Sequence, residues 1–142
     1  MKAEVHAFEE IQLGDTASFI KAWSQEDVAT FASLSGDENP LHTDETYASQ
    51  TQFGKPIVHG MLVASSFSTL LGMYLPGMYC LYMKQDIVFK NPVYPGEELL
   101  VEGTVARIIE ATRMLEIHMS ISRNGTTVVE GNALVQVQPS YE

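Results

Sequence analysis

The sequence predicts an α+β fold in which an antiparallel sheet curls around one long helix. The first observation is that residues 56–75 are apolar around most of a helical circumference. A helix that lacks a polar face is normally enclosed by other structure. The second observation is that the segments after Pro76-Gly77 tend to alternate between apolar and polar side chains, as strands do. The expected strands are Tyr79–Lys90, Glu97–Glu110, Arg113–Arg123 and Thr126–Val137.

The length and charge of the chain limit its class. A chain of 142 residues has the size of one domain, so we expect a single domain over residues 1–142. The formal net charge of −10 argues against nucleic acid or an anionic membrane as the partner. The apolar run from Met61 to Leu75 is too short and too interrupted by polar residues to span a bilayer. Residues 1–10 lack an apolar signal core, so we expect a cytoplasmic protein.

The region before the central helix begins with a strand and a capped helix. Ala17–Trp23 is a candidate fifth strand of the sheet. Ser24 followed by Asp27 resembles a capping box, with aspartate in place of the usual glutamate or glutamine. The helix that it opens covers residues 25–34 and ends at Ser35-Gly36.

A second short helix precedes the central one. Thr43 is its expected N-cap, and the helix runs to about Gln50. After a connecting loop, the main helix is expected to cover Pro56–Leu75.

The last hairpin allows a prediction of register. A three-residue loop over residues 124–126 pairs Ile121 with Val129 and keeps the apolar faces of both strands together. It also puts the small residue Gly131 on that face, where a helix could pack closely. A two-residue Asn124-Gly125 turn would instead bring polar groups onto the face. We therefore predict the three-residue loop with a bulge.

Two stretches combine into one predicted site, Gly-Asp-Glu-Asn-Pro-Leu-His at residues 36–42 and Pro-Ile-Val-His-Gly-Met at residues 56–61. Pro40 fixes its own φ and pushes the preceding residue out of the α region. Asp37 and His42 therefore cannot share a helix face, and a bend must bring them together. A glycine at the start of the following helix leaves backbone N–H groups open to an anion. An acid–base pair beside an anion site suits a reaction that passes through an enolate.

Three blocks of the sequence resemble the MaoC-like dehydratases. Residues 28–42, with the pattern Val-Ala-x-Phe-Ala-x-Leu-Ser-Gly-Asp-x-Asn-Pro-Leu-His, are similar to the hydratase-2 signature of that family. Pro-Ile-Val-His-Gly-Met-Leu at residues 56–62 and Phe-Lys-x-Pro-Val-x-Pro-Gly-Glu at residues 89–97 match two further family blocks in the expected order. The likeness extends from about Leu13 to Val137 and is strongest to the short R-specific enoyl-CoA hydratases.

The resemblance implies a hot-dog fold, in which the sheet wraps the central helix, and a homodimer with active sites at or near its interface. It implies a lyase of fatty acid metabolism that hydrates trans-2-enoyl-CoA to (R)-3-hydroxyacyl-CoA, or catalyses the reverse dehydration. The acyl carrier is CoA or acyl carrier protein, and no metal or redox cofactor is needed. The catalytic groups that it implies are Asp37, His42 and the backbone N–H of Gly60, with Ser68 in support. Asn39 is expected to brace the loop through side-chain to backbone hydrogen bonds.

Substrate-binding residues are predicted on the same basis. Leu71 and Val135 are the expected walls of an apolar tunnel for the acyl chain. Lys55, Lys84 and Lys90 are candidates for binding the phosphates of CoA. On an acidic protein, three lysines are equally well explained as ordinary surface charges.

The remaining reactive side chains have ordinary interpretations. Cys80 is the only cysteine and lies in an apolar run, so a buried thiol is expected rather than a nucleophile. His59, in a His-Gly turn beside a buried helix, is expected to make a structural hydrogen bond. His6 belongs to an N-terminal arm and His118 to the polar face of a strand. The four histidines are not spaced as metal ligands, so no metal site is expected.

Two other functions stay open at this point. A hot-dog thioesterase would use the carboxylate to activate water against the thioester carbonyl, and the Asn-Pro-Leu-His run argues against it. A non-catalytic module that binds acyl thioesters is the second alternative, because a fold does not fix a function.

Overall fold

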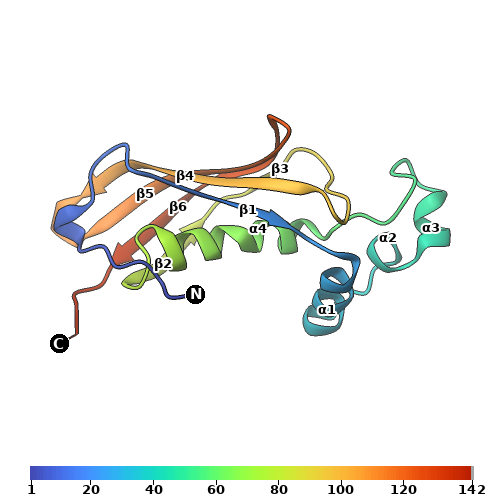
Figure 1. Cartoon of the computed structure of the whole chain (residues 1–142), viewed down its shortest axis with the longest axis horizontal. Coiled ribbons are helices and arrows are strands. Elements are labelled where there is room, and N and C mark those ends of the chain that lie inside the picture. Colours follow the sequence, from blue (N-terminus) through green and yellow to red (C-terminus); the bar gives the residue numbers. More distant parts are fainter. Residues whose placement is uncertain (142) are drawn as a thin grey trace.

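Helix α4 (Gly60–Thr69) lies against one face of an antiparallel sheet in the computed structural model, which describes residues 1–141 (Figure 1). The five main strands occur in the spatial order β1 (Thr16–Ala22), β4 (Glu98–Ile109), β5 (Met114–Arg123), β6 (Thr126–Val137) and β2 (Cys80–Gln85). The short strand β3 (Val88–Phe89) also pairs with β6. The predicted α+β class and the strand near Ala17 are confirmed.

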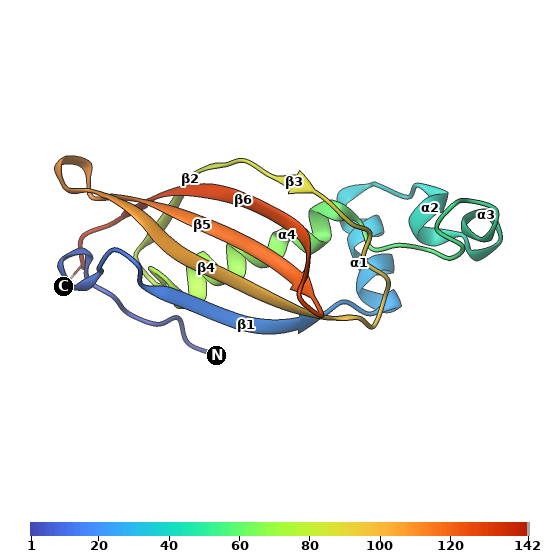
Figure 2. The same cartoon turned by 90° about the horizontal axis from the view of Figure 1, so that it is seen from above.

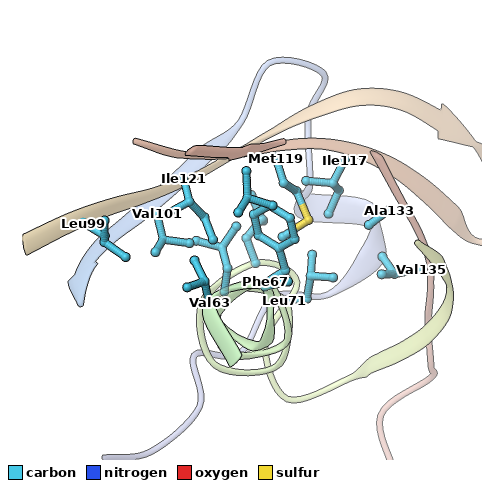
Figure 3. Packing of buried hydrophobic residues seen from close by; sticks show 14 of the residues in the cluster. Val63, Phe67, Leu71, Leu99, Val101, Ile117, Met119, Ile121, Ala133 and Val135 are labelled. Carbon is cyan, nitrogen blue, oxygen red and sulfur yellow. The ribbon is translucent and has the colours of Figure 1, made fainter. Parts of the chain in front are cut away.

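The core forms between α4 and the facing side of the sheet. Val63 and Phe67 of the helix point toward the strands, whose inward side chains point back at them (Figure 3). Alternate residues of β4 and β5 are buried, as a half-buried strand requires. Gly103 of β4 lets the helix approach closely, because a Cβ at that position would overlap the side chain of Leu70. The strand residues that make this face are Leu99, Val101, Val105, Leu115, Ile117, Met119 and Ile121.

Helices α1 (Gln25–Ser35), α2 (Pro40–Thr43) and α3 (Glu45–Ser49) lie beyond one end of the sheet (Figure 2). The predicted capping box is confirmed: Ser24 Oγ accepts from Asp27 N–H at 3.0 Å, and the Asp27 carboxylate accepts from Ser24 N–H at 2.9 Å. The Ser24 backbone N–H, followed by the Ser24 hydroxyl, lowers the pKa of the Asp27 carboxyl. Gly36, at φ 82°, ends α1 in the left-handed region.

The expected cap of the second helix was wrong. Asp44 caps α3, because its carboxylate accepts from Tyr47 N–H at 3.0 Å. Thr43 instead ends α2, and its hydroxyl donates back to the Asn39 carbonyl at 3.2 Å. The loop predicted over residues 37–42 therefore contains a helical turn that begins at Pro40, a favoured first helical residue.

The central helix begins at Gly60 and not at Pro56 as predicted. Residues 56–59 lie outside the helix: Pro56 has no backbone N–H, and other segments accept from the N–H groups of Ile57 and Val58. Ile57 N–H donates to the Leu41 carbonyl at 3.3 Å, and Val58 N–H donates to the Val93 carbonyl at 2.7 Å. After Thr69 the chain continues as a π-helical turn, η2 (Leu70–Tyr74).

The predicted strand Tyr79–Lys90 is divided into β2 and β3. The register against β6 shifts between Tyr82 and Lys84, and the two strands are separated at residues 86–87. The carbonyl of Asp86 lies where a Cβ of Gly131 would be. The missing side chain of Gly131 therefore leaves space for the backbone of Asp86, and not for a helix as the sequence suggested.

The register of the last hairpin was predicted correctly, but its loop was not. Ile121 pairs with Val129, as expected. The turn nevertheless has two residues, Asn124 and Gly125, both with positive φ, as a primed hairpin turn requires. A bulge at Val128 then changes the register between the pair Ser122–Thr127 and the pair Ile121–Val129.

No helix in residues 1–141 has both the length and the hydrophobicity that a bilayer crossing requires.

Candidate active site

The two stretches singled out in the sequence meet at a cavity of about 470 Å³. Asp37 and His42 come from the loop after α1, and His59 and Gly60 come from the start of α4. Apolar side chains make most of the remaining wall. The other lining residues are Phe53, Ile57, Val58, Met61, Val63, Phe89, Lys90, Asn91, Pro92, Val93 and Val129.

Two reciprocal hydrogen bonds from imidazoles to backbone carbonyls join these stretches. His42 Nδ1 lies 2.8 Å from the Ile57 carbonyl oxygen, and His59 Nε2 lies 2.9 Å from the Asp37 carbonyl oxygen. The two rings stack between these bonds, with centroids 3.9 Å apart and planes inclined by 29°. We call this arrangement of Asp37, His42, Ile57 and His59 the histidine clasp. The structural hydrogen bond predicted for His59 is confirmed.

The clasp fixes the tautomers of both imidazoles. A carbonyl oxygen only accepts, so the ring proton of neutral His42 is on Nδ1, and its Nε2 is left as a free acceptor. By the same argument the ring proton of neutral His59 is on Nε2. His42 therefore offers a basic nitrogen, whereas the polar hydrogen of His59 is already used within the protein.

Asp37 is held at the base of the loop by its neighbours. Its N–H donates to Ser35 Oγ at 3.1 Å, and its Oδ1 accepts from Asn39 N–H at 3.2 Å. Asn39 braces the next turn as predicted, since its Oδ1 accepts from Leu41 N–H at 2.9 Å. The second carboxylate oxygen of Asp37 makes no hydrogen bond within residues 1–141, and the side chain is exposed. It is therefore available to a ligand in the cavity.

Three ligating atoms, one each from Asp37, His42 and His59, lie within 4.8 Å of one another. This spacing would allow a shared metal ion. One nitrogen of each imidazole is bonded to a carbonyl, so each ring has one nitrogen left for a ligand. The same grouping could hold a water molecule between the carboxylate and His42.

Gly60 is the first residue of α4, and the first N–H groups of a helix have no acceptor within it. The phenyl ring of Phe89 lies directly over this residue, and a Cβ at Gly60 would come within 2.8 Å of it. Glycine therefore allows the aromatic wall of the cavity to approach the helix start. The backbone N–H at this position, together with the helix dipole, favours a developing negative charge.

Comparison with known proteins identifies the family. Residues 9–129 match the MaoC like domain. The chain belongs to the MaoC-like family. It is 41% identical over 128 residues to an (R)-specific enoyl-CoA hydratase of Aeromonas caviae, covering 89% of this chain and 96% of the relative. It is 38% identical over 133 residues to an (R)-specific enoyl-CoA hydratase of Rhodospirillum rubrum, covering 94% and 92%.

A solved structure of an (R)-hydratase from A. caviae superposes on this MaoC-like chain with a TM-score of 0.88 at 40% identity. The match covers 91% of this chain and 98% of the solved one. It confirms the predicted hot-dog fold, with the antiparallel sheet against the central helix.

Three other predicted site residues do not line this cavity. Leu71 and Val135 are fully buried and belong to the core between helix and sheet (Figure 3), outside the cavity lining. They do not line the cavity of the single chain, and their role as walls of an acyl tunnel stays a prediction. Ser68 is exposed on α4 and also lies outside the lining.

The three candidate lysines have different positions. Lys90 lines the cavity, and its ammonium lies 2.6 Å from the Glu130 carboxylate. Lys55 lies 4.7 Å above the ring of Tyr94, in a neighbouring cleft. Lys84 is exposed on β2 and lies outside the cavity lining. Only Lys90 is placed to meet a ligand at the cavity itself.

The sequence analysis missed the aromatic and apolar walls. Phe53, Met61, Phe89 and Val129 line the cavity, although they come from a loop, a helix start and two strands. Phe89 carried a signal, since it opens the third family block, but nothing local indicated that it packs on Gly60.

Cys80 provides a test of burial that is independent of activity. Burial raises the pKa of its thiol to about 11, so the thiolate appears only as the pH approaches that value. At pH 8 about one molecule in a thousand carries the thiolate, against roughly one in four for an unfolded cysteine of pKa about 8.5. We expect iodoacetamide to alkylate the native protein roughly two hundredfold more slowly than the denatured chain, with a tenfold gain per pH unit. A native rate that levels off near pH 9 would contradict this burial.

Proposed function

We propose that this MaoC-like protein is an R-specific enoyl-CoA hydratase. It adds water to a trans-2-enoyl-CoA to give the (R)-3-hydroxyacyl-CoA, or catalyses the reverse dehydration. The observation that carries this proposal is the Asp37 carboxylate and the free Nε2 of His42 facing one cavity, beside the N–H of Gly60. The names of the Aeromonas and Rhodospirillum relatives support the same reaction.

In the forward direction, Asp37 and His42 hold a water molecule above the enoyl double bond. The oxygen of that water forms a bond to C3 as one O–H bond breaks and its proton passes to the pair. The double-bond electrons move toward the thioester oxygen, and the pair then delivers a proton to C2. One water is consumed and no oxidant or reductant is needed. Each proton transfer by a positioned group typically contributes 10²- to 10⁴-fold in rate.

The thioester oxygen requires a donor while it carries negative charge, and the N–H of Gly60 supplies one. A donor aimed at a developing oxyanion typically contributes about 3–4 kcal/mol to the barrier. The phenyl ring of Phe89 over Gly60 lowers the local dielectric and strengthens this interaction. We assign Lys90, which lines the same cavity, to a phosphate of CoA, for which its ammonium would exchange the Glu130 carboxylate.

A homodimer is the second part of the proposal. Strand β2 ends the sheet on one side, and large apolar side chains are exposed along it and along β3. An unpaired apolar edge of this kind is normally covered by another chain. The exposed side chains are Leu81, Met83, Val88 and Phe89, with Met61 of α4 nearby in the cavity.

Crotonyl-CoA provides the first test. The wild-type protein is expected to consume its conjugated enoyl absorbance, and Asp37→Asn or His42→Ala is expected to lower kcat at least a hundredfold with the fold intact by circular dichroism. Release of free thiol would identify a thioesterase instead. Binding without turnover, unchanged in both variants, would identify a non-catalytic module.

The Gly60 donor can be removed without changing the rest of the backbone. Proline is tolerated at the first helical position, and the preceding His59 already has the extended ψ of 132° that proline requires. Gly60→Ala is the matched control, because it adds the same Cβ contact to Phe89 and keeps the N–H. We expect Gly60→Pro to lower kcat about 10²- to 10³-fold below Gly60→Ala. Equal kcat values in the two variants would remove Gly60 from the mechanism.

The dimer can be tested at its proposed edge. The double variant Met83→Lys and Val88→Lys places two charges on exposed apolar positions of β2 and β3. Light scattering after gel filtration is expected to report a dimer for the wild type and a monomer for this variant. Leu34→Lys, at a still more exposed apolar residue of α1, is the control and should stay dimeric. A monomeric wild type would refute the dimer.

A further inference from the structure

His59 contacts both members of the proposed catalytic pair, and it lines the same cavity with an almost fully buried side chain. Its Nε2 lies 2.9 Å from the Asp37 carbonyl oxygen, and its ring stacks on His42 at 3.9 Å. Phe31 of α1 meets His59 edge-on, with centroids 4.8 Å apart. The side chain is 2% exposed. It is therefore enclosed between α1, the Asp37 loop and the helix start.

The hydrogen-bond pattern excludes His59 as a carrier of protons. Its ring N–H donates a hydrogen bond to the Asp37 carbonyl oxygen. Its Nδ1 is buried and has no partner within residues 1–141. A buried nitrogen without a polar partner among the described residues has no hydrogen-bonded route for a proton to the substrate. The role of the residue must therefore lie in what it holds.

From this geometry we infer that His59 is a positioning residue for the proposed hydration, setting Asp37 through its carbonyl and His42 through ring stacking. The inference rests on the proposed function. The other hydrogen bonds that Asp37 itself makes within residues 1–141 are those to its exposed neighbours Ser35 and Asn39. The bond from His59 is the contact that ties this loop to the buried start of α4.

The position of His59 also couples the pair to the oxyanion donor. His59 is the N-cap of α4 and directly precedes Gly60, so its backbone sets the direction of the first helical N–H. The same residue therefore determines the separation between the water held by the pair and the thioester oxygen. A misplacement of about 1 Å between reacting groups typically costs a hundredfold in rate.

Two substitutions separate the hydrogen bond from the stacked ring. His59→Phe keeps an aromatic ring against His42 but removes the donor to Asp37. His59→Gln keeps an N–H donor at a similar reach but removes the ring. We expect His59→Phe to lower kcat for crotonyl-CoA hydration 10- to 100-fold and His59→Gln to lower it 3- to 10-fold, each with KM within about threefold of the wild type.

The control is the equivalent pair at His118, an exposed histidine of β5 whose Nδ1 lies 3.1 Å from Asn132 Oδ1. His118→Phe and His118→Gln should leave kcat and KM unchanged. Each variant is assayed well below its own melting temperature, with its folded fraction measured by circular dichroism. If His59→Phe does not fold, His59→Gln decides the question alone, and a wild-type kcat in it overturns the inference.

A spectroscopic measurement adds a readout that does not depend on activity. Long-range ¹H–¹⁵N spectra of the wild type are expected to show His42 protonated on Nδ1 and His59 on Nε2. The opposite tautomer at His59 would overturn the inference. Wild-type protein that fails to hydrate crotonyl-CoA contradicts the proposed function. Active wild type with unaffected His59 variants contradicts only the role of His59.

Discussion

The candidate site depends on the histidine clasp, in which each of two distant segments donates an imidazole hydrogen bond to a carbonyl of the other. His42 of the loop reaches Ile57, and His59 of the helix start reaches Asp37. Neither segment forms regular structure long enough to position these side chains alone. A buried carbonyl or imidazole N–H that has no hydrogen-bond partner costs free energy of folding. The two bonds therefore hold the segments in one relative position.

The core determines where the clasp can form. Val63 and Phe67 place α4 against the sheet, and Gly103 lets the far end of the helix lie close to β4. Val63 is buried one turn after Gly60, so packing in the core directly fixes the helix start. The extended segment before it is tied to Val93 through Val58. The N–H of Gly60, the proposed oxyanion donor, therefore lies at the end of a helix packed into the core, whereas the Asp37 carboxylate lies on an exposed loop.

Local chemistry predicted much of this structure, and distant contacts account for what it missed. The Ser24–Asp27 capping box, the pairing of Ile121 with Val129 and the bend at Pro40 depend on residues near one another in the chain. The late start of α4 and the break between β2 and β3 depend on backbone partners 16 to 46 residues away, such as Leu41, Val93 and Asn132. At the site, the motif identified Asp37, His42 and Gly60, but the wall made by Phe53 and Phe89 follows from packing that no short pattern encodes.

The cavity and the exposed apolar edge are parts of one surface. Met61 and Phe89 belong to both, since each lines the cavity and is half exposed. A second copy that covered this edge would therefore also close the cavity and exclude water from the thioester oxygen, which strengthens every electrostatic interaction there. Ser68, on the exposed side of the same helix, could support the reaction only if the wall of the site continues onto a neighbouring chain. The supporting role of Ser68 therefore depends on the proposed homodimer, whereas the homodimer is argued from the exposed apolar edge alone.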